Sequence, residues 1–70
     1  MSLSNLKSEG HLFHDLDRVK LLKSVTAKGK ALDPGLLGTV VFCYGREACE
    51  VEFDAFDDVY QIPAEDLEKI

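Results

Sequence analysis

Hydrophobic and acidic residues alternate regularly in the segment from residue 49 to residue 55. The apolar positions are Cys49, Val51, Phe53 and Ala55, and the acidic positions between them are Glu50, Glu52 and Asp54. Strict alternation is typical of a β-strand with one buried and one solvated face. The pattern therefore predicts a strand that presents a row of carboxylates to solvent.

A second strand is predicted over residues 38–44, whose sequence is GTVVFCY. Its side chains are β-branched or aromatic in both phases, which is typical of a central strand. Gly45 and Arg46 follow, and they suit a two-residue type II′ turn because the first turn position needs a positive φ. The two strands are therefore expected to form a hairpin.

The register of this hairpin follows from the choice of buried face. If Val40, Phe42 and Tyr44 point inward, even positions of the first strand pair with odd positions of the second. Cys43 then points away from Cys49, so we expect no disulfide between them. Two cysteines are also too few for a disulfide-dense secreted scaffold, which favours a reducing compartment.

Weaker patterns complete the chain. Residues 1–17 are interpreted as an N-terminal extension, partly mobile or forming a short helical turn through Leu12, Phe13 and Leu16. The remaining segments are a strand within residues 18–25, a long loop over 26–35 ending in the Asp33-Pro34-Gly35 turn, a strand over 59–62 and a helical turn over 63–67.

Together these elements predict a mainly β fold, a small SH3-like antiparallel barrel of four to five strands with a short C-terminal helical turn, over residues 18–70. The expected core is Val19, Leu21, Val40, Phe42, Tyr44, Val51, Phe53, Ile62 and Leu67. Phe13, Phe56 and Tyr60 are the aromatic residues expected to reach the surface, too few for the groove that binds proline-rich peptides.

Length and composition fit one small domain. The chain has 70 residues and a formal net charge of −5. Its longest apolar run is five residues, over 40–44, far below the ~20 residues of a membrane helix, and no N-terminal segment resembles a signal peptide. We therefore expect a cytoplasmic protein without a membrane partner.

The charge is divided unevenly along the chain. Residues 1–46 carry seven basic against four acidic side chains, whereas residues 47–70 carry one against nine. The acidic half is either a solvated sheet face that guards an edge from pairing or a docking face for a basic protein. The candidate docking residues are Glu50, Glu52, Asp54, Phe56, Asp57 and Asp58. Alternatively, the same interaction module would self-associate through an exposed strand edge.

A nucleic-acid-binding barrel of the KOW type is the alternative function. Its phosphate contacts would come from Arg18, Lys20, Lys23, Lys28, Lys30 and Arg46. The acidic half of the chain repels phosphate at long range, so nucleic acid is the less favoured partner.

No catalytic, metal or cofactor site is expected. His11, His14, Asp15 and Asp17 form a cluster that lacks the four recognisable ligands of a structural zinc site. Glu47 and Glu50 near the cysteines would raise a thiol pKa rather than lower it, which disfavours nucleophilic catalysis. The sequence therefore points to a protein that is not an enzyme.

Three short motifs suggest a family. They are Gly35-x-x-Gly38-Thr39-Val40-Val41, then Glu50-Val51-Glu52-Phe53, then Pro63-Ala64-Glu65-Asp66-Leu67. In this order and spacing, over about residues 18–67, the chain resembles a bacterial family of short proteins known only as a domain of unknown function. The resemblance implies an SH3-like small β-barrel without established catalytic residues. By analogy, such a protein could be the antitoxin or immunity-type partner of a neighbouring gene product.

Overall fold

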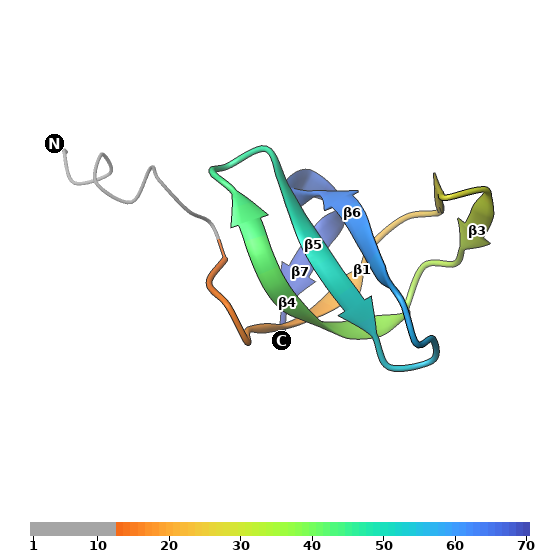
Figure 1. Ribbon diagram of the computed structural model, residues 1–70, viewed down its shortest axis with the longest axis horizontal. Helices are drawn as coiled ribbons and strands as arrows, with labels where there is room; N and C mark the ends of the chain where they lie inside the picture. Colours follow the sequence, from red (N-terminus) through yellow and green to blue (C-terminus); the bar gives the residue numbers. More distant parts are fainter. Residues whose placement is uncertain (1–12) are drawn as a thin grey trace, which may run out of the picture.

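The computed structural model describes residues 13–70, which form a mainly β structure (Figure 1). Its elements are β1 (Arg18–Leu21), β2 (Val25–Ala27), β3 (Lys30–Leu32), β4 (Leu37–Tyr44), β5 (Ala48–Phe53), β6 (Val59–Pro63), the 3-10 turn η2 (Ala64–Asp66) and β7 (Leu67–Lys69). The predicted mainly β class and the C-terminal helical turn are confirmed.

Five of these strands make one antiparallel sheet in the order β6-β5-β4-β1-β7. Strands β6 and β7 are its two edges and do not pair with each other, so the hydrogen-bonded ladder stays open. The sequence pattern missed β7, because a three-residue strand is too short to display an alternation. In the structure β7 pairs with β1, which brings Leu67 opposite Leu21.

Strands β2 and β3 form a separate two-stranded hairpin, so the prediction of a long loop over residues 26–35 is wrong. Lys28 and Gly29 make its turn with φ angles of 54° and 73°. Positive φ at two consecutive residues is what a two-residue type I′ hairpin turn requires. Leu32 anchors the hairpin because its side chain is buried in the core.

A β-bulge in β4 sets which side chains face the core. Val40 pairs with Val51, but the next pair is Phe42 with Glu50, so Val41 is an extra residue without a partner on β5. Before the bulge the even-numbered side chains of β4 point to the core, and beyond it the odd-numbered ones do. The prediction that Phe42 and Tyr44 are buried is therefore wrong, because their side chains are 52% and 45% exposed.

The bulge also brings the two cysteines together. Cys43 lies opposite Cys49, with the Cα atoms 4.0 Å apart, and both side chains are buried. They form a disulfide, so the prediction that they point apart is wrong. The cysteines of this protein therefore do not favour a reducing compartment.

The turn between β4 and β5 has the predicted glycine conformation but is one residue longer than predicted. Gly45 has the expected positive φ, 61°, and the Glu47 amide donates to the Tyr44 carbonyl at 3.2 Å. The ladder, however, resumes with Tyr44 opposite Ala48, so Glu47 extends the connection to three residues. The expected pairing of even with odd positions therefore holds up to Val40 and is wrong beyond the bulge, where Tyr44 pairs with Ala48.

The core lies on the inner face of the sheet. Val19, Leu21, Val40, Val51, Phe53, Ile62 and Leu67 are buried as predicted, and Phe13, Leu32, Cys43, Cys49, Tyr60 and Ala64 join them. The predicted exposure of Phe13 and Tyr60 is wrong. Leu16 is 77% exposed with a φ of 74°, which places it in a non-helical turn.

No helix within residues 13–70 is long and apolar enough to cross a membrane.

Candidate interaction surface on the outer face of β4 and β5

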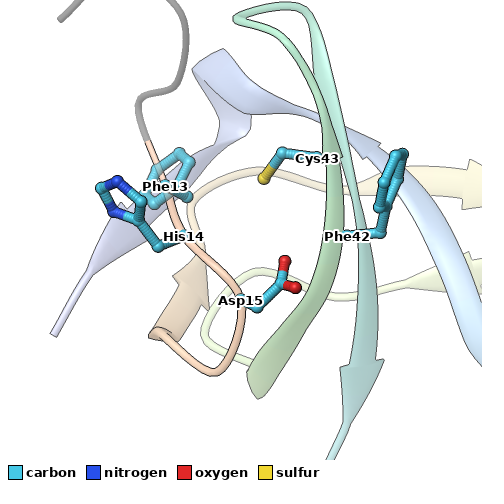
Figure 2. A pocket seen from close by; sticks show the side chains of 5 residues that line it. All are labelled: Phe13, His14, Asp15, Phe42 and Cys43. Carbon is cyan, nitrogen blue, oxygen red and sulfur yellow. The ribbon is translucent and has the colours of Figure 1, made fainter.

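An exposed aromatic pair stands on the outer face of β4, beyond the bulge. The rings of Phe42 and Tyr44 have centroids 5.0 Å apart and planes at 77°, an edge-to-face contact. Figure 2 shows that the Phe42 side chain and the Cys43 sulfur lie on opposite sides of β4. The bulge therefore directs the sulfur inward and leaves the ring in solvent.

Glu50 of β5 is tied to this pair. The Tyr44 hydroxyl donates a hydrogen bond to Oε2 of Glu50 at 2.8 Å. This bond stabilises the neutral phenol next to a carboxylate, which raises the pKa of Tyr44 above its ordinary value of 10.0. Phe42, Tyr44 and Glu50, named here the aromatic–carboxylate cluster, thus form one connected surface feature.

Glu52 continues the acidic row on the same face. Its side chain is exposed and makes no ion pair with another residue of the described chain. Across the sheet it lies opposite Thr39 of β4 and Val59 of β6, neither of which is charged. Glu52 therefore has no charged partner directly across the sheet, and the nearby Arg18 guanidinium donates to the Thr39 hydroxyl at 2.9 Å.

Two of the predicted docking carboxylates are already engaged within the molecule. The two terminal guanidinium nitrogens of Arg18 donate to the two oxygens of the Asp54 carboxylate, at 2.8 and 2.6 Å. The Lys28 ammonium lies 3.0 Å from Oδ1 of Asp58. These donors lower the pKa of each carboxyl below its ordinary value of 3.8.

The other two predicted docking residues lie close to these ion pairs. Phe56 is half-buried beneath the Lys30 ammonium, which stands 4.5 Å from the ring centroid. Asp57 is exposed in the connection from β5 to β6. The six predicted residues therefore divide between the outer face, which holds Glu50 and Glu52, and the β5–β6 connection.

The basic residues of the nucleic-acid alternative do not form one free patch. Arg18, Lys23 and Lys28 pair with Asp54, Asp66 and Asp58, while Lys28 and Lys30 also stand over the rings of Tyr60 and Phe56. Lys20 lies opposite Glu68 in the β1–β7 ladder, and Arg46 lies in the β4–β5 turn. Three of these basic side chains are thus paired with carboxylates of the same chain. The others lie in different parts of the fold.

The histidine cluster is only partly within the structure. His11 lies outside the described residues, and the His14 amide donates to Oδ2 of Asp17 at 2.9 Å. This bond and the nearby Lys69 lower the pKa of Asp17 below 3.8. Over residues 13–70 no group of three or more His, Cys, Asp or Glu side chains is placed to hold a metal ion.

A small open cavity of about 270 Å³ lies between this segment and β4 (Figure 2). Its lining residues are Phe13, His14, Asp15, Phe42 and Cys43. Since Cys43 is held in the disulfide, the thiolate needed for nucleophilic chemistry is absent from this cavity in the structure.

Sequence reasoning missed the aromatic–carboxylate cluster because it placed Phe42 and Tyr44 inside. The available signal was the pair of cysteines on either side of the turn: pairing Cys43 with Cys49 would have forced both aromatic residues outward.

Comparisons with protein-family models, with curated proteins and with solved structures found no match. The resemblance to a family of short bacterial proteins stays a prediction.

Proposed function

We propose that the protein is a non-catalytic interaction module that binds a basic protein partner through the outer face of β4 and β5. The observation that carries the proposal is the group of two exposed aromatic rings, the half-buried Glu50 beside them, and the exposed Glu52, which forms no ion pair within the described chain. An exposed apolar patch next to charges of one sign is typical of a protein-binding surface. The carboxylates would contribute mainly association rate and selectivity.

We assign the fold to the SH3-like class as part of the same proposal. Its support is the pairing of β1 with β7, the 3-10 turn η2 before β7, and the continuous ladder from β4 to β6. In this arrangement β4 and β5 each have a hydrogen-bonded neighbour on both sides. Backbone held in a sheet loses little conformational entropy when a partner binds.

The distribution of basic residues favours a protein partner over nucleic acid. Arg18, Lys23 and Lys28 are engaged by carboxylates of the same chain. Phosphate groups would have to compete with those carboxylates for the basic side chains, whereas a basic protein segment would bind the carboxylates of the outer face directly.

Binding of a lysine- and arginine-rich peptide, followed by fluorescence anisotropy at low and high salt, tests the proposal. We expect salt-sensitive binding that the double variant Glu50→Gln/Glu52→Gln weakens by about fivefold, because two charge contacts are lost. The matched control Glu65→Gln/Glu68→Gln removes the same net charge from η2 and β7. Equal weakening by both double variants, or the absence of peptide binding, would overturn the proposal.

Self-association is tested on the same samples. Light scattering across a range of protein concentrations measures whether the edges β6 or β7 pair between copies. A dimer that competes with the basic peptide would show that the outer face serves a second copy instead.

A further inference from the structure

We infer that the aromatic–carboxylate cluster holds one guanidinium group of the partner, so that the module prefers arginine to lysine at this point. The inference rests on the proposed function and names the partner chemistry that the outer face selects. Its three residues come from two adjacent strands and are already connected by a hydrogen bond and a ring contact.

The first argument is a comparison within the molecule. The half-buried ring of Phe56 and the buried ring of Tyr60 each carry a lysine ammonium of the same chain, at 4.5 and 5.2 Å from the centroid. Within residues 13–70, no cation stands over Phe42 or Tyr44, although these rings are the more exposed. A cation from another molecule could therefore stand over the exposed part of these rings without competing with a cation of the described chain.

The second argument concerns the carboxylate. Glu50 is half-buried, and its Oε2 accepts the Tyr44 hydroxyl at 2.8 Å, which restrains the side chain beside the rings. Its other oxygen, Oε1, makes no hydrogen bond or ion pair within the described chain. A restrained acceptor loses less rotamer freedom on binding than a mobile surface glutamate.

The third argument distinguishes the two basic side chains. A guanidinium group is planar, so it can stack on a ring while its in-plane N–H groups donate to a carboxylate. A lysine ammonium is compact and strongly hydrated, and it cannot stack. Val41, which is 37% exposed beside Phe42, offers further apolar contact to the methylene stem of the ligand.

Two peptides that differ at one position test the inference. Both carry the same basic sequence, and the central residue is arginine in one and lysine in the other. We expect the wild-type protein to bind the arginine peptide about threefold to fivefold more tightly. Two-dimensional NMR should show the Phe42 and Tyr44 ring signals shifting more with the arginine peptide.

Three variants assign this preference to the cluster. Phe42→Leu should bring the ratio of the two affinities close to one while salt-sensitive binding of both peptides persists. Tyr44→Phe keeps the ring but removes the hydrogen bond to Glu50, and it should lower the ratio less. Leu22→Ala, a change at an exposed leucine outside this face, should leave the ratio unchanged.

The outcomes separate the inference from the proposed function. An unchanged arginine preference in Phe42→Leu overturns the inference alone, whereas failure of the wild-type protein to bind either peptide overturns both. Ring shifts that appear on concentrating the protein by itself would assign the cluster to a second copy. Shifts produced only by a single-stranded oligonucleotide would assign it to base stacking, and either result rejects the inference.

Discussion

Cys43 lies directly opposite Cys49 on the buried face of the β4–β5 hairpin, with the two Cα atoms 4.0 Å apart. This relationship and the exposure of Phe42 and Tyr44 have one common cause, the unpaired Val41 at the β-bulge. A strand with strict alternation could not direct Val40 and Cys43 to the same face. The bulge therefore closes the hairpin with a covalent bond and creates the surface that we propose binds a partner.

Reduction of the disulfide should destabilise the protein by about 2 kcal/mol, since the bond closes a short loop in the unfolded chain. Urea unfolding with and without a reductant measures this change. The variant Cys43→Ala/Cys49→Ala is the control, and its stability should not respond to the reductant. An unchanged unfolding midpoint for the wild-type protein in reductant would contradict the prediction.

Gly38→Ala should lower the free energy of unfolding by about 1–3 kcal/mol through overpacking. A Cβ atom at this position would stand 2.7 Å from Cγ1 of Val51 and 2.8 Å from the carbonyl oxygen of Glu52. Gly29→Ala is a useful comparison, because its Cβ would meet nothing within 4 Å and only the φ of 73° opposes it. Thermal unfolding should show the larger loss for Gly38→Ala, and the reverse order would contradict the steric argument.

Leu32→Ala should cost about 2–5 kcal/mol, the range for emptying a buried leucine site. Leu32 is 1% exposed in β3, inside the segment whose sequence suggests only a loop. Leu22→Ala removes a leucine that is 46% exposed and should cost much less. Equal losses in chemical denaturation would mean that the β2–β3 hairpin does not pack on the core.

Acid should destabilise the wild-type protein partly through Asp54. Arg18 holds the folded-state pKa of this carboxyl below 3.8, so the associated stability is present above that value and is lost as the pH falls through the folded pKa. Asp54→Asn should be less stable at neutral pH and should lose less stability on acidification. Thermal midpoints recorded from about pH 7 to pH 2 measure the difference.

Asp57→Asn is the matched control for this prediction. It removes a carboxylate from the same connection, and Asp57 forms no ion pair with a residue of the described chain. Its acid dependence should follow that of the wild-type protein. High salt should also narrow the difference between wild type and Asp54→Asn, because both partners of the Arg18 pair are exposed.

Local sequence determined the elements whose pattern is long and regular. The alternation over residues 49–55 placed β5 with its buried Val51 and Phe53 and its outward Glu50 and Glu52, but the strand ends at Phe53 and Ala55, expected on the buried face, is exposed in the following turn. Gly45 determined the hairpin turn, since its φ of 61° is costly for other residues. These features depend on period-two geometry and backbone sterics, which act between near neighbours in the chain.

Tertiary structure decided what local pattern left open. Strand β4 is apolar in both phases, so its own sequence fits either face, and only packing against β5 and the core selected the bulge at Val41. The Arg18–Asp54 pair joins residues 36 positions apart, which no local spacing can reveal. The acidic composition was visible in the sequence. Which carboxylates are paired, however, depended on which strands became neighbours, because charges interact through space rather than along the chain.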